Sequence, residues 1–320
     1  MRRSRAPRSP SCFVLFFLFS SATVHADELL VTGFFSNTVG RFDAASGSFL
    51  GNLQGGVGLE GAICARVGPD NLLYVCSEAT DSIQRYNLAS GAFIDEFVAP
   101  GTGGLDGPTS LTWNAAGDLI VASFNTDAIL RFDGNTGASL GTLVAPGGGG
   151  FLNGPDNGTV IGPDGALWVP SYFNNRVLRY DADTGDFLGI FGPAIGRPRV
   201  IDFRDGSVYI TAESQDSVRR FDMDGVSLGN FVQPGAGALD APVGMAWGPD
   251  GDLYVTSSTL DKINRYDGNT GAFLEEFIAP GTGGIDGPLF LTFVPEPSGG
   301  IVLAFVGFAA LRASRRQRST

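Results

Sequence analysis

One short phrase recurs six times along this chain of 320 residues: an arginine, an aromatic residue and usually an aspartate. It stands as Arg41-Phe42-Asp43, Arg85-Tyr86-Asn87, Arg131-Phe132-Asp133, Arg179-Tyr180-Asp181, Arg220-Phe221-Asp222 and Arg265-Tyr266-Asp267. Successive arginines lie 44, 46, 48, 41 and 45 residues apart. A period in this range is typical of a propeller blade made of four short strands. The repeat therefore predicts an all-β, six-bladed β-propeller, an architecture that carries many unrelated functions.

The clearest single unit runs from Gly251 to Pro288. It contains three β-rich segments, at residues 252–257, 262–267 and 272–278, and Gly287-Pro288 opens a fourth. Gly, Pro, Asn and Asp stand at the boundaries, where they supply turn geometries that β-branched residues disfavour. No helical period of 3.6 residues persists between the two ends of the chain, so we expect essentially no helix in the propeller.

The first blade is split between the two ends of the domain. Residues 28–32, 38–43 and 48–53 supply three of its strands, and residues 287–294 supply the missing innermost strand. A blade built in this way closes the ring and removes exposed sheet edges. We therefore predict one propeller domain over residues 27–294.

Three segments of one unit carry a family resemblance: residues 241–245 (APVGM), 248–255 (GPDGDLYV) and 261–267 (DKINRYD). These patterns resemble the repeats of NHL and streptogramin-lyase-like six-bladed propellers. The resemblance covers residues 27–294. It implies the fold, and it implies no single activity.

Residues 1–26 have the three parts of a secretory signal peptide. Arginines come first, an apolar stretch follows at residues 12–19, and Val24-His25-Ala26 forms a small-residue cleavage site. Cleavage after Ala26 would start the mature chain at Asp27. An anchor made from the same stretch is disfavoured, because about 20 apolar residues are needed to span a bilayer.

The other end, residues 295–320, has a different three-part pattern. Pro295-Glu296-Pro297 is followed by the apolar run 301–311 and then by four arginines. This order resembles the PEP-CTERM sorting signal of Gram-negative bacteria, with a short hydrophobic helix that contacts the membrane before processing. The resemblance implies an exosortase and the export machinery as partners, and a location in the cell envelope, at the cell surface or outside the cell. An ordinary tail anchor is the alternative.

Charge and histidine content limit the functions open to the mature chain. All 33 acidic residues lie between Asp27 and Glu296, and 13 Lys and Arg remain once both ends are removed, which gives a net charge of 13 − 33 = −20. Such a field repels nucleic acid. The only histidine, His25, leaves with the signal peptide. Acid–base catalysis by histidine and histidine-ligated metals are therefore excluded.

Two cysteines remain in the mature chain, Cys64 and Cys76. They are centred on Asp70 in a hairpin turn, so a symmetric hairpin places them opposite each other. In an exported protein this placement favours a cross-strand disulfide. Two unpaired core thiols are the alternative, because disulfide geometry between adjacent strands is often strained.

Each of five blades carries an acidic or amide residue just before its inner strand. These residues are Glu60, Asp106, Asn153, Asp240 and Asp286. Oxygen ligands around one mouth of the channel would suit Ca²⁺. The competing explanation, which we favour, is that each residue caps its own turn, since a feature repeated in every blade is most simply structural.

Variable positions are better candidates for a binding site. Five of them follow the second strands of their blades, and two come from the shortened loop that opens blade five; they are Phe34, Glu78, Phe124, Tyr172, Glu213, Arg197 and Arg199. Exposed aromatic rings, carboxylates and a local basic patch suit a polar polymer or a peptide. Ordinary loop variation is the alternative.

These observations favour an exported, surface-sorted propeller that binds a protein or polysaccharide partner, with no catalytic residues. The alternative is a metal-dependent propeller enzyme of gluconolactonase or streptogramin-lyase type. Streptogramin lyases rely on a histidine that the mature chain lacks. Gly58-Leu59-Glu60-Gly61 loosely resembles the metal-binding Glu-Gly-Pro segment of gluconolactonases, although Ala62 replaces the proline.

Overall fold

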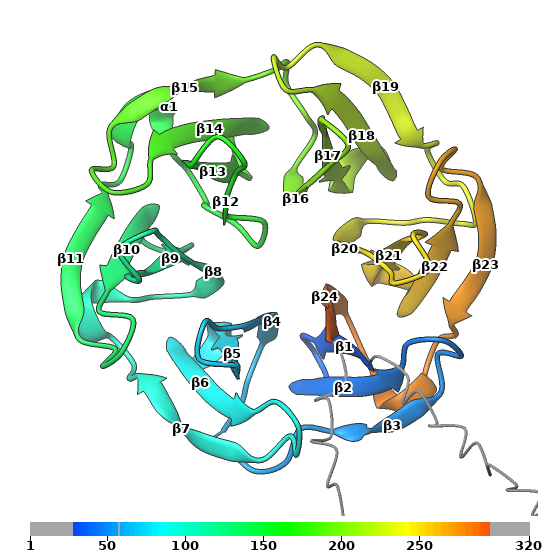
Figure 1. Ribbon diagram of the computed structural model, residues 1–320, viewed down its shortest axis with the longest axis horizontal. Helices are drawn as coiled ribbons and strands as arrows, with labels where there is room; N and C mark the ends of the chain where they lie inside the picture. The colour runs from blue at the N-terminus through cyan, green and yellow to red at the C-terminus, as the bar shows by residue number, and fades with distance from the viewer. Residues whose placement is uncertain (1–27, 57, 295–320) are drawn as a thin grey trace, which may run out of the picture.

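The computed structural model describes residues 28–56 and 58–294. They form six four-stranded antiparallel sheets, arranged as blades around a central axis (Figure 1). The all-β, six-bladed propeller predicted from the repeat is confirmed. No helix within the described part of the chain is long and apolar enough to cross a membrane.

The blades follow the chain in order, each with its innermost strand given first. Blade one contains β24 (Pro288–Val294), β1 (Glu28–Gly33), β2 (Thr38–Asp43) and β3 (Phe49–Asn52), and blade two contains β4 (Ala62–Val67), β5 (Leu72–Ser77), β6 (Ser82–Asn87) and β7 (Phe93–Val98). Blade three contains β8 (Pro108–Trp113), β9 (Leu119–Ser123), β10 (Ala128–Phe132) and β11 (Ser139–Val144), and blade four contains β12 (Val160–Ile161), β13 (Ala166–Ser171), β14 (Arg176–Asp181) and β15 (Phe187–Phe191). Blade five contains β16 (Pro198–Arg204), β17 (Ser207–Ala212), β18 (Ser217–Asp222) and β19 (Ser227–Val232), and blade six contains β20 (Pro242–Trp247), β21 (Leu253–Ser257), β22 (Lys262–Tyr266) and β23 (Phe273–Ile278).

Helical structure in the described residues is confined to short turns between strands. One is α1 (Gly148–Phe151), and the 3-10 turns are η1 (Glu78–Thr80), η2 (Thr102–Gly104), η3 (Glu213–Gln215), η4 (Ser258–Leu260) and η5 (Thr282–Gly284). Turns of three or four residues bury no apolar face of their own. The expectation of essentially no helix in the propeller is confirmed.

The ring closes as the sequence predicts. Strand β24 pairs with β1, so that Glu28 stands opposite Val294 and Val31 stands opposite Leu291. The first and last described residues are therefore neighbours in one sheet, and Figure 1 shows β24 at the inner edge of the blade. A single strand from the C-terminal end thus holds the first blade together.

The aromatic residue of the repeated phrase forms the core between blades. All six are fully buried: Phe42, Tyr86, Phe132, Tyr180, Phe221 and Tyr266. They pack among the aliphatic side chains of the second strands, which are also buried except at Leu72, the first residue of β5. The large apolar side chains of adjacent sheets thus fill the space between blades. Each repeat of the sequence therefore contributes an equivalent part of the core.

The repeated arginines are part of the framework. Five of them lie within 4 Å of a carboxylate on their own blade: Arg41 of Glu28, Arg85 of Asp95, Arg131 of Asp118, Arg179 of Asp164 and Arg265 of Asp252. Arg220 instead donates to the Ser207 hydroxyl. Several also lie over an aromatic ring of the second strand, such as Arg85 over Tyr74. These contacts hold neighbouring strands of each blade together.

A second sixfold feature links each blade to the next. The residue that closes the turn between the second and third strands has a positive φ, and its side-chain oxygen accepts a hydrogen bond from a backbone N–H in the loop that opens the following blade. The acceptors are Asn37, Asp81, Asp127, Asn175, Asp216 and Asp261, and the donors are Gly61, Gly107, Gly154, Arg197, Ala241 and Gly287. Asn and Asp suit this place because they tolerate the left-handed conformation. We call this contact the Asx clasp.

The Asx clasp makes a testable contribution to stability. We expect Asp127→Gly to lower the free energy of unfolding by about 1 to 2 kcal/mol, because the Gly154 N–H loses its acceptor while the backbone conformation stays accessible. Asp127→Asn should change stability little, since asparagine fills the same place at Asn37 and Asn175. Urea denaturation of the two variants measures the difference, and equal losses would contradict a clasp that depends on the side-chain oxygen.

Candidate functional site

The central channel opens at two ends that differ in chemistry. The inner strands begin at one end, where a cavity of about 580 Å³ is lined by Ala241 and Gly287 and by the loops between blades. We call it the loop mouth. At the other end the inner strands finish, and a cavity of about 740 Å³ is lined by residues such as Trp247 and Phe293. We call it the tail cavity, because the described chain begins and ends beside it at the paired residues Glu28 and Val294.

The variable residues singled out from the sequence converge on the loop mouth. Six of the seven line it: Phe34, Glu78, Phe124, Tyr172, Arg199 and Glu213. Five of these six directly follow the second strands β1, β5, β9, β13 and β17. Because the blades repeat around the axis, equivalent residues of different blades lie at the same level along the channel. The structure therefore brings together residues that lie up to 179 positions apart in the sequence (213 − 34).

Arg199 is the centre of the polar contacts in the loop mouth. Its side chain is only 14% exposed, and it forms ion pairs with Asp156 and with Glu213, the latter at 2.6 Å. Burial disfavours the charged guanidinium, but the two carboxylates outweigh this effect and raise the pKa of Arg199 above its usual range. Arg199 is therefore a fixed positive charge held between two acids.

Tyr172 joins this ion-pair network from the neighbouring blade. Its hydroxyl donates to Glu213 Oε1 at 3.0 Å, and the guanidinium of Arg199 lies 4.7 Å from the centre of its ring. Burial, together with the charge of Glu213, raises the pKa of the Tyr172 hydroxyl. The exposed Arg197 pairs with the same carboxylate at 3.2 Å and lies over the other part of the ring at 5.3 Å. The loop mouth thus has a rigid polar wall made by blades four and five.

The sequence analysis missed Asp156, the buried partner of Arg199. Asp156 is fully buried, and burial raises the pKa of its carboxyl although Arg199 opposes the shift. It lies where the inner strand of blade four is interrupted, so that only Val160 and Ile161 pair as β12. A sequence signal was present, because Asp156 stands directly after the proline, where every other blade except blade five, with Arg199, has an uncharged residue.

Aromatic rings continue the wall next to Tyr172. Phe124 lies 5.4 Å from Phe173 and 6.1 Å from Tyr172, measured between ring centres. Phe34 packs edge to face on Phe35 at 5.1 Å. Phe35 and Phe173 are more than half exposed. Large exposed rings beside a cavity are typical of a surface that binds a partner.

Glu78 differs from the other acids of the loop mouth. Burial and the nearby charge of Asp156 raise the pKa of Glu78 to about 7, although Arg199 opposes the shift. Its carboxyl faces the cavity beside the ion-pair network. A carboxyl with this pKa changes charge near neutral pH, so it adds a titratable group to an otherwise fixed set of charges.

Glu78 predicts a specific dependence of stability on pH. Its pKa in the folded protein, about 7, is above the ordinary value of 4.5, so the folded state holds the proton more tightly than the unfolded chain. The free energy of unfolding should therefore fall as the pH rises between these two values. At pH 8 we expect Glu78→Gln to be more stable than the native protein by roughly 1 to 3 kcal/mol, and so to unfold at a higher temperature. At pH 4.5 we expect no such gain in stability. Thermal melts at both pH values measure this, with the exposed Glu60→Gln as a control that should change little. A gain that is equal at both pH values would contradict the assignment.

The backbone of the residues considered for a calcium ring is held by contacts within each blade. The backbone N–H and C=O of four of them bond to the serine that ends the second strand of the same blade: Glu60 to Ser77, Asp106 to Ser123, Asn153 to Ser171 and Asp240 to Ser257. Of the five, Asp286 alone lines the loop mouth. Within residues 28–56 and 58–294, no three acidic, cysteine or histidine side chains lie close enough together to hold a metal ion. Calcium binding by these five residues stays a prediction from the sequence.

Cys64 and Cys76 face each other, but they are not joined. The two residues are direct partners in the pairing of β4 with β5, as the hairpin symmetry predicts. Both are free, buried thiols. Burial raises the pKa of Cys76, which keeps that thiol protonated and unreactive. The expected disulfide is thus absent, and the alternative of two core thiols describes the structure, in line with the strain that adjacent strands impose on a disulfide.

The two predicted targeting signals lie outside the described residues. They are the signal peptide with its cleavage site at Ala26 and the sorting motif Pro295-Glu296-Pro297. They remain predictions from the sequence. The sorting motif follows Val294 directly, so any tail function begins where β24 ends.

Comparison with known proteins supports the fold. No protein-family model and no curated protein sequence matches this chain. A protein of unknown function from Bacteroides caccae aligns over 84% of this chain and 99% of its own, with 13% identity and a TM-score of 0.64. A chain from a nidogen/laminin complex aligns over 85% and 99%, with 14% identity and a TM-score of 0.66.

Lyases are also among the similar structures. A catalytically inactive virginiamycin B lyase from Staphylococcus aureus, solved with quinupristin, aligns over 86% of this chain and 94% of its own, with 19% identity and a TM-score of 0.57. A streptogramin B lyase has 16% identity and a TM-score of 0.60. Enzymes and a protein complex thus share this architecture, which does not decide between catalysis and binding. At these identities the likeness shows that the chain has the six-bladed propeller fold of the streptogramin-lyase-like structures.

Proposed function

We propose that the protein is an exported, exosortase-sorted propeller of the cell surface or extracellular matrix that binds a polysaccharide or an envelope protein at its loop mouth. The observation that carries this proposal is the convergence of variable residues on one cavity. Aromatic rings line that cavity together with Arg199 and its two carboxylate partners. Residues that are equivalent by repeat differ from blade to blade around this cavity, as a single off-axis ligand requires.

The size and walls of the loop mouth suit part of a polymer. Its volume of about 580 Å³ is in the range of ordinary ligand sites. The rings of Phe124 and Tyr172 offer flat apolar faces, and the carboxylate of Glu78 offers an acceptor for hydroxyl or ammonium groups. A sugar has both kinds of surface, because its C–H groups form an apolar face and its hydroxyl groups lie at the edge.

Charge narrows the class of ligand. The acidic residues that line the loop mouth are Glu78, Asp156, Glu213, Asp261 and Asp286, whereas Arg199 is the lining cation. Together with the net charge of −20 expected for the mature chain, this balance disfavours polyanions such as uronic-acid polymers. We therefore propose a neutral or amine-bearing polysaccharide, or a basic segment of an envelope protein.

The position of the tail supports display at a surface. The chain leaves the propeller at Val294, beside the tail cavity and at the far end of the channel from the loop mouth. A protein held through residues that follow Val294 would keep the loop mouth open. Mass spectrometry of the native protein tests export and sorting together. We expect an N-terminus at Asp27 and a C-terminus trimmed near the sorting motif, and an intact chain at both ends would contradict this part of the proposal.

A pull-down with cell-envelope glycans tests the loop mouth. We expect the combined variant Phe124→Ala, Tyr172→Ala to lose most of its capture, because it removes both flat faces of the cavity. Arg131→Ala is the control, since Arg131 is a repeated framework arginine in the same blade as Phe124, and it should keep its capture. Circular dichroism confirms that each variant is folded. Unchanged capture by a folded double variant would remove the site from the loop mouth.

A further inference from the structure

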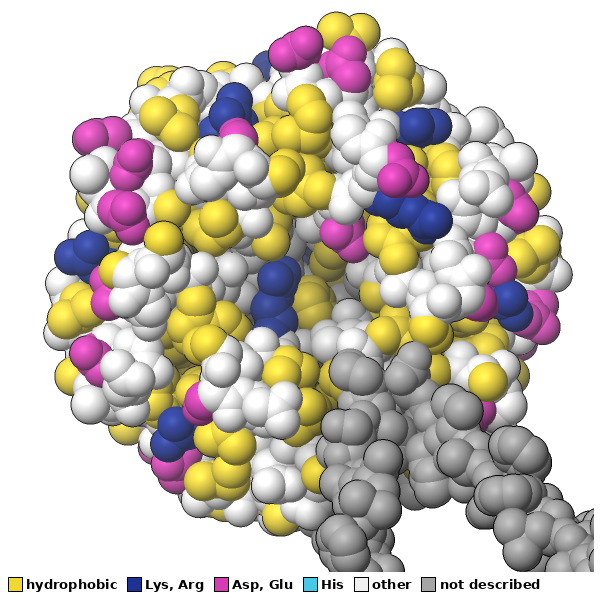
Figure 2. Space-filling model, in the orientation of Figure 1, with side chains coloured by type: hydrophobic (Ala, Val, Ile, Leu, Met, Phe, Trp, Pro, Cys, Tyr) yellow, Lys and Arg dark blue, Asp and Glu magenta, His cyan; other side chains and the backbone are white. Residues whose placement is uncertain are grey.

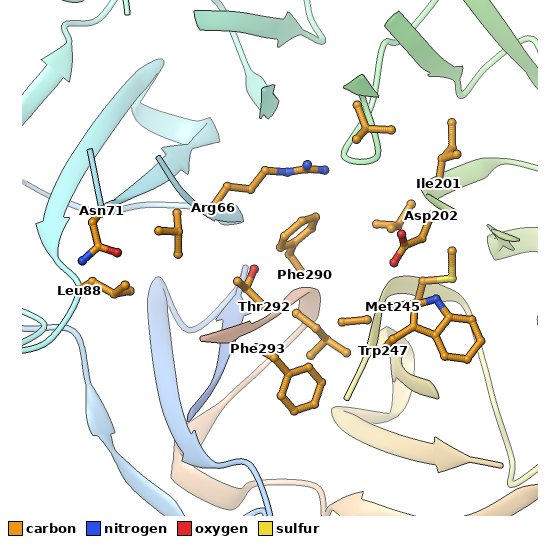
Figure 3. A pocket seen from close by; sticks show the side chains of 15 residues that line it. Arg66, Asn71, Leu88, Ile201, Asp202, Met245, Trp247, Phe290, Thr292 and Phe293 are labelled. Carbon is orange, nitrogen blue, oxygen red and sulfur yellow. The ribbon is translucent and has the colours of Figure 1, made fainter. Parts of the chain in front are cut away.

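The tail cavity is a second concave site, at the opposite end of the channel from the loop mouth. Its volume is about 740 Å³, and inner strands of several blades line it. Figure 2 shows the ring hollowed at its centre on the face where the described chain begins and ends, and Figure 3 shows the side chains around the hollow. The proposed binding at the loop mouth uses none of these residues, so the tail cavity requires its own explanation.

Arg66 gives the tail cavity its charge. It comes from the end of inner strand β4, and its guanidinium reaches past Phe290 toward the centre of the cavity (Figure 3). The guanidinium carbon lies 5.3 Å from the centre of the Phe290 ring. The Nε atom is buried and has no hydrogen-bond partner, and among the described residues no carboxylate forms an ion pair with Arg66. Most of the framework arginines, in contrast, are paired with an acid.

Arg66 is partly buried, and its Nε–H, which is buried without an acceptor, carries a cost in free energy. Arginine remains protonated at all physiological pH values, so it cannot escape the cost of desolvation by losing its proton. A planar carboxylate is the partner that offsets this cost best, because it accepts two parallel hydrogen bonds from a guanidinium. Arg66 therefore has the chemistry of a carboxylate-binding group that lacks its partner in the protein.

Asp202 faces the same cavity from inner strand β16 (Figure 3). Its carboxyl accepts a hydrogen bond from the N–H of Phe203 at 2.7 Å and forms no ion pair with Arg66. Burial raises the pKa of Asp202, although Arg66 and Arg204 oppose the shift. The two groups stand across a space from each other, which leaves the guanidinium free for a ligand.

The remaining walls are mostly apolar. Phe290, Met245 and Trp247 line the cavity, and Trp247 is held in place by Arg204, whose guanidinium lies 4.1 Å from the ring centre. A cavity with one cationic group and aromatic walls excludes strongly hydrated ions such as free phosphate, because their solvation would be lost without replacement. It favours an anion that carries its own apolar surface.

We propose that the tail cavity binds a small organic acid with an apolar body, whose carboxylate pairs with the guanidinium of Arg66 and whose body packs against Phe290, Met245 and Trp247. This site is separate from the loop mouth and does not depend on the function proposed there. Asp202 tunes the affinity, since its negative charge opposes that of the ligand. A neutral ligand of the same shape would leave Arg66 unpaired and should bind more weakly.

Calorimetry with phenylacetate as the probe tests the site on the purified protein. We expect millimolar or tighter binding of phenylacetate, and about ten-fold weaker binding of phenylacetamide, which has the same body without the charge. Because this comparison uses the native protein, it does not depend on the folding of any variant. No binding of phenylacetate at millimolar concentrations, or equal binding of the two probes, would overturn the proposal.

Three variants then test the roles of the charged groups. Arg66→Gln should weaken phenylacetate binding by about ten-fold, and Arg131→Gln, a matched loss of one positive charge far from the cavity, should leave it unchanged. Asp202→Asn should tighten binding, because it removes the opposing negative charge. The required order of affinity is Asp202→Asn, then the native protein and Arg131→Gln, then Arg66→Gln. Binding by a folded Arg66→Gln variant as tight as that of the native protein would show that Arg66 does not recognise the carboxylate.

Discussion

Removal of residues 287–320 is expected to abolish cooperative folding, whereas removal of residues 298–320 should leave the thermal unfolding of the propeller unchanged. The first deletion removes β24, the inner strand of blade one, and exposes the full edge of β1. It also removes the buried side chains of Phe290, Leu291 and Val294. Each such side chain contributes about 1.5 to 3 kcal/mol on burial, and their sum is close to the whole stability of a typical domain.

Differential scanning calorimetry of the two truncated proteins measures this contrast. We expect the shorter protein to aggregate or to show no cooperative transition, since an open edge of β1 invites pairing with another chain. The longer protein still contains all of β24 and should melt like the native protein. Equal melting temperatures for the two proteins would mean that β24 does not carry the closure of the ring.

The sequence alone was enough to predict the architecture, because the repeat is long and regular. The arginine and aromatic residues of each unit lie at equivalent places in the third strand of each blade, and the expected closing strand at 287–294 is observed at Pro288–Val294. The first strand ends at Gly33, one residue beyond the expected Thr32. Boundaries of this kind depend on individual turn contacts, which a pattern of residue types does not specify.

The candidate site was predictable only where it followed the repeat. Glu78 and Tyr172 were found because alignment of the units places them at equivalent positions after the second strands. Asp156 was missed because it precedes the short inner strand β12, at a place where the repeat predicts an ordinary strand. Arg199 and Asp156 come from adjacent blades. The repeat pattern of a single blade does not predict which residues of two blades will pair.

The two unconfirmed expectations share a physical cause. The proposed calcium ring assumed that repeated side chains point to the axis, but their positions are fixed by backbone contacts with serines such as Ser77 and Ser123. The proposed disulfide assumed that opposite residues can always be joined. Cys64 and Cys76 are opposite, yet pairing in the strand ladder does not ensure the geometry that a disulfide requires. In both cases the sequence places the residues, but the repeat does not specify their side-chain geometry.

The ion-pair network of the loop mouth predicts the largest effect of any single substitution. We expect Arg199→Met to lower the free energy of unfolding by about 3 to 5 kcal/mol, because it leaves the carboxylate of Asp156 buried without its partner. For a domain of this size, such a loss lowers the melting temperature by roughly 6 to 20 °C. Arg131→Met is the matched control. It breaks the more exposed pair with Asp118 at 3.8 Å and should cost less than about 1 kcal/mol.

A double variant separates the cost of the buried charge from the cost of lost packing. Asp156→Asn removes the negative charge that Arg199→Met would leave without a partner, so the combined variant should be more stable than Arg199→Met alone. Glu213 keeps its contacts with Arg197 and Tyr172 in both proteins, which holds the rest of the wall constant. Recovery of stability in the double variant therefore reports the charge at Asp156. If the double variant is no more stable than Arg199→Met, the main role of Arg199 is to fill space against the ring of Tyr172, and the network would have to be described as packing instead of charge pairing.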